Sequence, residues 1–290
     1  MKRLAIVLIF VCICIIIISQ IYVSKFNKTT TIIKTNTTRK PVILESNISS
    51  GAGVIIEFRS NNYLVAIILN VFHNIPSNWS IQLFHGSSNY EFIMNSTSLL
   101  YFIKIRRLIL TQLPEYTGAS SQRHSFLNRL LTNESFWKRV INVEKILFFQ
   151  LDTVFCSNSP YKFSDFLEWD YIGAPWPYSW INMTGGSLVG NGGFSLRSRS
   201  KTLALIKTKP YSLSIYEDLY FGKYMPLVGG KVAPFEIAQK FSSEGQHYIN
   251  SMAIHKPFGD NYGRICQLCP EANLIPPFCR SQPPPYLFSM

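Results

Sequence analysis

The sequence predicts an α/β protein with a mostly parallel sheet, helices on both faces of the sheet, and a single N-terminal transmembrane helix before it. From residue 54 onward, short apolar runs alternate with segments of helical periodicity, and this alternation is typical of parallel strands joined by helices. An apolar content of 47% with only 15% charged residues excludes a disordered chain. Residues 4–18 form an unbroken apolar run, and the first charge after it is Lys25.

The elements of the α/β part follow one another along the chain. The expected strands are residues 54–58, 81–84, 145–151 and 171–174, with another after the glycine-rich turn within residues 188–196. The expected helices are residues 64–72, 125–131, 135–140, 161–169, 198–207, 216–224 and 234–242. Asn133 or Thr132 can cap the helix that starts at residue 135. The proline-rich tail from residue 274 is expected to be irregular.

The N-terminal apolar segment predicts a membrane anchor. As a helix, residues 4–24 would span roughly 30 Å, about the thickness of a bilayer core. A cleaved signal peptide is the alternative, but the run is longer than a usual signal-peptide core and no clear cleavage site follows it. The expected organisation is a cytoplasmic tail (1–3), a signal anchor (4–24), a stem (25–52), a globular domain (53–265) and a Cys/Pro-rich tail (266–290).

Glycosylation signals and cysteines both favour a lumenal position for the globular domain. Outside the apolar segment, Cys156, Cys266, Cys269 and Cys279 permit three pairing schemes. A zinc site at Cys266 and Cys269 lacks a second cysteine pair, so disulfides in an oxidising compartment are favoured. Seven Asn-x-Ser/Thr sequons begin at Asn27, Asn36, Asn47, Asn78, Asn95, Asn133 and Asn182.

The net charge of +12 does not predict a nucleic-acid-binding protein. From Pro41 onward there are 21 basic against 16 acidic residues, so the excess surrounds the apolar segment, as expected near anionic lipid. No basic stripe interleaved with aromatic residues follows. The seven basic residues among the first forty are Lys2, Arg3, Lys25, Lys28, Lys34, Arg39 and Lys40.

Asp152 directly follows the strongly apolar strand at residues 145–151. Ligands of open α/β sheets bind beyond the carboxyl ends of the strands, and a carboxylate there can hold Mg²⁺ or Mn²⁺ against a diphosphate. The alternative is structural, because an Asp can also cap a turn through the amides of Thr153 and Val154.

A family resemblance starts around Asp152. Residues 130–159 resemble an uncharacterised glycosyltransferase-like family, a domain-of-unknown-function group whose members carry LIFQTDS where this chain has FFQLDTV. The resemblance continues in order through DYIGAPW (170–176), GNGGFSLRS (190–198), YEDL (216–219) and HKPF (255–258), and covers about residues 53–262. The family is similar to the GT-A class of nucleotide-sugar transferases, which implies a Rossmann-like domain that binds a sugar nucleotide, usually through Mn²⁺ or Mg²⁺.

The resemblance implies metal ligands at two positions. GT-A enzymes hold the ion with an Asp-x-Asp motif at a strand end, and here Gln150-Leu-Asp152 takes its place. Only Asp152 matches, because Gln150 offers a carbonyl oxygen without charge. His255 matches a late histidine that completes the metal site in many such enzymes, and imidazole favours Mn²⁺ over Mg²⁺. A histidine hydrogen-bonded at a strand end is the alternative.

The resemblance also implies a catalytic base at Glu217 or Asp218, at the start of an expected helix, with Asp218 favoured. Such an acid removes the proton from an acceptor hydroxyl as the hydroxyl attacks the sugar. Acids at this position also stabilise a helix through its dipole, which is the structural alternative.

Further binding residues are implied around the expected donor site. Glycines allow the backbone to approach a ligand closely, although such a cluster also forms ordinary turns and bulges. Trp176, with Tyr178 and Trp180, can stack on a sugar or anchor its own loop. Glu57 and Arg59 follow the first strand, where the base and ribose would approach. The glycine-rich turn itself is Gly190, Asn191, Gly192 and Gly193.

The function implied is metal-assisted transfer of a sugar from a nucleotide-sugar donor to a hydroxyl of a glycan or protein acceptor. An anchor, stem and lumenal domain resemble resident Golgi transferases, so a type II membrane protein of the Golgi or endoplasmic reticulum is expected. The first alternative is a catalytically inactive GT-A-like glycan-binding or scaffold protein, because Gln150 replaces an acid. A hydrolase with paired carboxylates is less favoured, because nothing in the sequence sets two acids at the required separation.

Overall fold

The computed structural model describes residues 51–116, 123–182, 184, 186–212, 215–244, 248–256 and 266–275. The expected cytoplasmic tail, signal anchor and nearly all of the stem (1–50) lie outside the described residues, as does the end of the C-terminal tail (276–290). Within the described part, no helix has both the length and the apolar character that crossing a bilayer requires.

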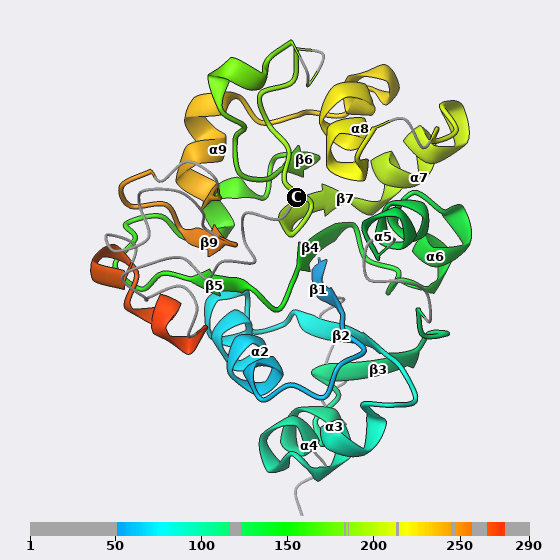
Figure 1. The fold of residues 1–290 in the computed structure, drawn as a ribbon, viewed down its shortest axis with the longest axis vertical. Coiled ribbons are helices and arrows are strands. Elements are labelled where there is room, and N and C mark those ends of the chain that lie inside the picture. Colours follow the sequence, from blue (N-terminus) through cyan, green and yellow to red (C-terminus); the bar gives the residue numbers. More distant parts are fainter. Residues whose placement is uncertain are drawn as a thin grey trace, which may run out of the picture. The chain divides into compact units, whose positions relative to one another are not determined.

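The centre of the described fold is a six-stranded sheet in the order β3-β2-β1-β4-β7-β6 (Figure 1). Neighbouring strands among β3, β2, β1 and β4 are parallel, whereas β7 is antiparallel to both β4 and β6. The expected mostly parallel sheet is therefore a mixed sheet with a parallel four-stranded part. The strands are β1 (Gly51–Ile56), β2 (Ser80–His85), β3 (Leu108–Gln112), β4 (Lys145–Phe149), β6 (Tyr171–Ile172) and β7 (Phe194–Ser198).

A second, smaller sheet extends from the end of β4. Its order is β5-β9-β8, with β5 (Thr153–Phe155) antiparallel to β9 (Ala253–His255) and β8 (Ser242–Ser243) parallel to β9. A disulfide from Cys156 to Cys269 attaches β5 to the short helix η5 (Pro270–Leu274). Cys266 is also disulfide-bonded, so the preference for disulfides over zinc is confirmed.

Helices cover both faces of the six-stranded sheet, as expected (Figure 1). Strand β1 separates two cores, because successive side chains point to opposite faces. Ile55 joins the core that contains Leu64 and Ile68 of α2, whereas Val54 joins the core of Trp137 in α6 and Phe221 in α8. The helices are α2 (Tyr63–Asn74), α3 (Tyr90–Asn95), α4 (Thr97–Lys104), α5 (Arg123–Leu131), α6 (Glu134–Arg139), α7 (Arg199–Thr208), α8 (Glu217–Tyr224) and α9 (Phe235–Phe241).

Most expected elements are present, and the differences have local causes. Asn133 caps α6, since its side chain accepts a hydrogen bond from the Ser135 amide at 2.7 Å. The expected helix at 161–169 is only one short 3₁₀ turn, η2 (Phe163–Phe166). Strand β7 starts at Phe194, directly after the glycine-rich turn as expected, and Asn191 in that turn has a φ of 66°. The helices α3 and α4 were not predicted, since each buries a single side chain.

The strand directions bring several segments to one edge of the sheet. Parallel β1 and β4 end there. Because β7 runs in the opposite direction, it begins there, and Phe149 at the end of β4 pairs with Phe194 at the start of β7. The QLD segment, the glycine-rich turn and the residues after β1 therefore meet at this edge, where open α/β sheets bind ligands.

Candidate active site

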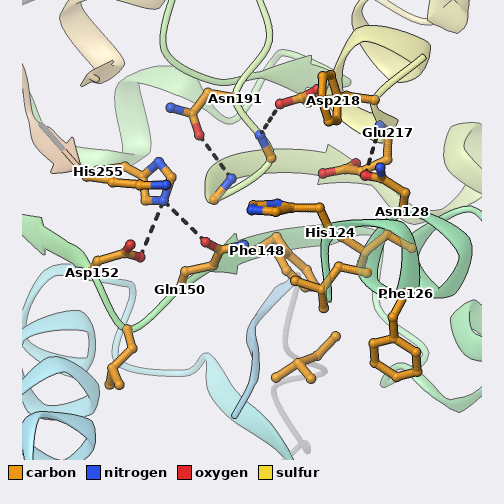
Figure 2. A pocket seen from close by; sticks show the side chains of 18 of the residues that line it. His124, Phe126, Asn128, Phe148, Gln150, Asp152, Asn191, Glu217, Asp218 and His255 are labelled. Carbon is orange, nitrogen blue, oxygen red and sulfur yellow. Dashed lines mark hydrogen bonds and ion pairs between the residues drawn. The ribbon is translucent and has the colours of Figure 1, made fainter. Parts of the chain in front are cut away.

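A cavity of about 320 Å³ lies at this edge of the sheet (Figure 2). Its walls come from the residues after β1 and β4, the turn before β7, the start of α8 and the end of β9. The sequence-predicted residues that line it are Glu57, Arg59, Gln150, Asp152, Asn191, Gly192, Gly193, Glu217, Asp218 and His255.

Two expected binding residues, Trp176 and Gly190, are not part of this lining. Trp176 packs against Gly190 so closely that a Cβ on the glycine would lie 1.9 Å from the indole Nε1. The Trp176 ring also stacks on Trp180, with 5.6 Å between ring centroids. Trp176 is thus packed within its own loop, and its role in ligand binding stays a prediction.

The two expected metal ligands lie side by side in the cavity (Figure 2). Nε2 of His255 is 3.4 Å from Oδ1 of Asp152 and 3.3 Å from Oε1 of Gln150. Strand pairing enforces this proximity, because Thr153 of β5 is opposite His255 of β9 and the Lys256 amide donates to the Asp152 carbonyl at 3.0 Å. These side chains therefore share one crevice although about a hundred positions separate them in sequence.

Charge within this cluster favours ionised partners. Burial alone would lower the pKa of His255, but the carboxylates of Asp152 and Glu244 outweigh burial and raise that pKa to about 10. Burial alone would raise the pKa of Asp152, but the nearby His255 outweighs burial and brings that pKa below its ordinary value. The Asp152 side chain remains 38% exposed, so it can still meet a ligand entering from solvent.

Glycines of the turn before β7 admit side chains of the protein itself. A Cβ on Gly193 would lie 2.1 Å from the ring of His255, and one on Gly192 would lie 1.8 Å from Oε1 of Glu217. The space beside these glycines, expected to admit a ligand, is thus occupied by the side chains of His255 and Glu217. Contact of these glycines with a ligand stays a prediction.

The acidic pair at the start of α8 divides into two environments. Glu217 is 6% exposed and pairs with Arg197, which is itself fully buried; Nη1 to Oε2 is 3.0 Å and Nη2 to Oε1 is 3.3 Å. Asp218 instead accepts from the amides of Gly192 at 3.2 Å and Leu219 at 2.8 Å. Glu217 is neutralised by its partner, whereas Asp218 has no cationic partner among the described residues.

The environment of Asp218 suits a proton acceptor at neutral pH. Burial, together with the negative charges of Glu217 and Glu244, raises the pKa of Asp218 to about 7. Its two amide hydrogen bonds oppose this shift only in part. A general base is most effective when its pKa is near the working pH.

After β1, Glu57 and Arg59 form a bidentate pair. Arg59 donates from Nε at 2.8 Å and from Nη2 at 2.7 Å to the Glu57 carboxylate. Glu57 is 2% exposed and Arg59 is 54% exposed. The pair fixes the guanidinium, part of which remains exposed to solvent.

Asn191 offers an unused hydrogen-bond donor. Its φ of 66° is in the left-handed region, and its Oδ1 accepts from the Gly193 amide at 2.9 Å. The residue is 1% exposed, and its Nδ2 has no hydrogen-bond partner among the described residues. Buried donors are nearly always satisfied, so Nδ2 is available to an oxygen of a bound molecule.

Several lining residues were not predicted. Glu244 follows the two-residue strand β8, and no sequence pattern indicated that strand. Asn128 of α5 accepts from the Glu217 amide at 3.3 Å, and its position on the inner side of a predicted helix was the available signal. The remaining ones are Ile56, Phe58, Tyr116, His124, Phe126, Leu127, Leu131, Phe148, Leu151, Tyr216 and Lys256.

The donors around His255 Nε2 fit a small divalent cation when Gln150 is included. Adjacent ligands of an octahedral ion with bonds of about 2.1 Å lie about 3 Å apart, close to the 3.3 and 3.4 Å separations here. Among the described residues, no group of three or more His, Cys, Asp or Glu side chains is arranged to hold a metal. The fit therefore depends on the amide oxygen of Gln150, and an ion would replace the proton shared by His255 and Asp152.

The described residues form an α/β fold with a mixed sheet and a cavity where its parallel strands end. The chain belongs to the DUF5672 family, described as proteins of unknown function, whose model matches residues 110–260. No match was found among curated protein sequences.

Among solved structures, the chain is similar to the mannosyltransferase PcManGT from Pyrobaculum calidifontis, solved in complex with GDP-Man and Mn²⁺. The alignment has 10% sequence identity and a TM-score of 0.45. It covers 81% of this chain and 66% of the mannosyltransferase.

Proposed function

We propose that this protein transfers a sugar from a nucleotide-sugar donor to an acceptor hydroxyl with the help of a divalent cation. One observation carries the proposal: a single cavity at the carboxyl ends of the parallel strands contains both a candidate cation site and a carboxylate suited to proton removal. The cation site is Asp152, His255 and Gln150, and the carboxylate is Asp218.

Asp152 and His255, with the carbonyl oxygen of Gln150, would hold Mn²⁺, or Mg²⁺ as the less favoured ion. Imidazole among the donors favours Mn²⁺. A bound divalent cation supplies charge neutralisation for the departing nucleoside diphosphate. Arg59, which interacts electrostatically with Asp152, would add a positive charge in the cavity, and the unused Nδ2 of Asn191 would orient an oxygen of the donor.

Asp218 would act as the base in this scheme. Its carboxylate takes the proton from the acceptor hydroxyl while that oxygen bonds to the sugar carbon and the bond to the diphosphate breaks. Glu217 is held by Arg197 and would position the start of α8, on which Asp218 lies. Binding roles for Trp176 and Gly190 stay predictions that would require an acceptor reaching beyond the cavity.

Nucleotide binding tests the proposal directly. The full chain, purified in detergent, should bind at least one common nucleoside diphosphate at least about tenfold more tightly with Mn²⁺ than with EDTA, because a cation held by Asp152 and His255 would offset the charge of the diphosphate. Isothermal titration of UDP, GDP and their sugars measures this. Binding without transfer would favour the inactive scaffold alternative, and no binding of any of them would count against both.

The pH dependence tests the role of Asp218. The base acts when ionised, so kcat/KM should rise roughly tenfold per pH unit below about 7 and level off above it, as the pKa of Asp218 requires. Asp218→Asn should lose about 10²- to 10⁴-fold in rate, and its residual activity should lack this rise.

A control measurement accompanies the pH profile. Mn²⁺ and donor binding are measured at each pH, so that a loss of ligand is not mistaken for a loss of base. A wild-type profile that stays flat between pH 5.5 and 8.5 would exclude Asp218 as the base.

A further inference from the structure

Glu244 reaches the cavity because of the register of the small sheet. Strand β8 is parallel to β9, with Ser242 next to Ala253 and Ser243 next to Ile254. One step further along this register, Glu244 comes beside His255. Its side chain is 14% exposed, and it lines the cavity.

The two ring nitrogens of His255 face different partners. Nε2 faces Asp152 and Gln150 inside the cavity, whereas Nδ1 lies 3.2 Å from Oε1 of Glu244. The ring is buried, and Nδ1 has no aligned hydrogen-bond partner among the described residues. Glu244 is thus the acceptor in reach of Nδ1, and a small side-chain adjustment would align the bond.

We propose that Glu244 is a positioning residue that holds His255 through Nδ1 and so presents Nε2 to the divalent cation. A histidine that binds a metal with one nitrogen almost always donates its other N–H to a carboxylate, carbonyl or water, which sets the tautomer and the ring orientation. The inference rests on the proposed function for the presence of a cation, and on the β8–β9 register for the residue.

Mn²⁺ binding measured without any nucleotide or activity tests this inference. Free Mn²⁺ is counted by electron paramagnetic resonance during titration of the full chain in detergent. Glu244→Met removes the acceptor and should weaken Mn²⁺ binding by about 10- to 100-fold, the usual effect of losing such a partner. Glu244→Gln keeps an acceptor oxygen, so it should lose less than the Met variant.

The matched control is Glu236→Gln, which removes an exposed acid of α9 away from the cavity and should leave the Mn²⁺ affinity unchanged. Thermal unfolding checks that each variant is folded, and the Gln variant carries the test if the Met variant is not. Wild-type affinity in both Glu244 variants would overturn the inference and leave the proposed function intact. A wild-type chain that binds no Mn²⁺ would overturn the inference together with the cation in the proposed function.

Discussion

Asp152→Asn should reduce sugar transfer by about 10³-fold and abolish the Mn²⁺ dependence of nucleotide binding. The substitution keeps the shape of the side chain and removes the only acid of the QLD segment. A bound cation contributes several kcal/mol of charge stabilisation in the transition state, and about 1.4 kcal/mol corresponds to a tenfold change in rate. Initial rates with the donor identified by titration, and Mn²⁺ titrations of the variant, measure both effects.

Glu168→Gln is the matched control for Asp152→Asn, because Glu168 is exposed and lies outside the cavity lining. It should retain wild-type rates and wild-type Mn²⁺ binding. An Asp152→Asn variant that transfers sugar at close to the wild-type rate would exclude the proposed cation site, whatever its effect on stability.

Arg197→Met should lower the free energy of unfolding by about 3–5 kcal/mol, the usual cost of removing one partner from a buried ion pair. Arg197 is fully buried, and its guanidinium lies 4.8 Å from the centroid of Phe221 and 5.3 Å from that of Phe148. Its guanidinium also neutralises the carboxylate of Glu217, and the substitution would leave that carboxylate unpaired inside the protein. Urea unfolding of the full chain in detergent measures the change.

A second substitution separates charge from packing. Arg197→Met with Glu217→Met removes both charges and should regain a large part of the lost stability, since an apolar pair can replace a buried ion pair. Arg129→Met, at an exposed position of α5, should change the free energy of unfolding by less than about 0.5 kcal/mol. A single Arg197→Met variant as stable as the wild type would show that the pair does not hold this region.

The spacing of apolar residues along the sequence predicted several of the strands and helices that surround the cavity. Asp152 was found because a carboxylate directly follows an apolar strand, and residues 64–72 were found because their apolar spacing matches one face of a helix. His255 and Asp218 needed the family resemblance, since a lone histidine or a helix-start acid is usually structural. For Asp152 and Asp218 the sequence indicated the residue type and the element, whereas strand β9, which ends at His255, was not predicted.

The residues that were missed depend on pairings that are distant in sequence. Glu244 enters the cavity through β8 and β9, which have two and three residues and are too short to produce a period. Arg197 lies one residue beyond the strand predicted within residues 188–196, and arginine is rarely fully buried, so its pairing with Glu217 was not expected. The glycines were recognised as permitting close approach, although the groups that approach, His255 and Glu217, come from later segments.

The residues that line the cavity extend from Ile56, near the start of the described chain, to Lys256, in its C-terminal part. These positions adjoin only when both sheets have assembled, so a molecule that fits between them has no counterpart site in the unfolded chain. Such a molecule adds RT ln(1 + [L]/Kd) to the folding free energy, about 2.7 kcal/mol at a hundred times Kd. A rise in melting temperature would therefore reveal candidate donors and cations before any acceptor is known.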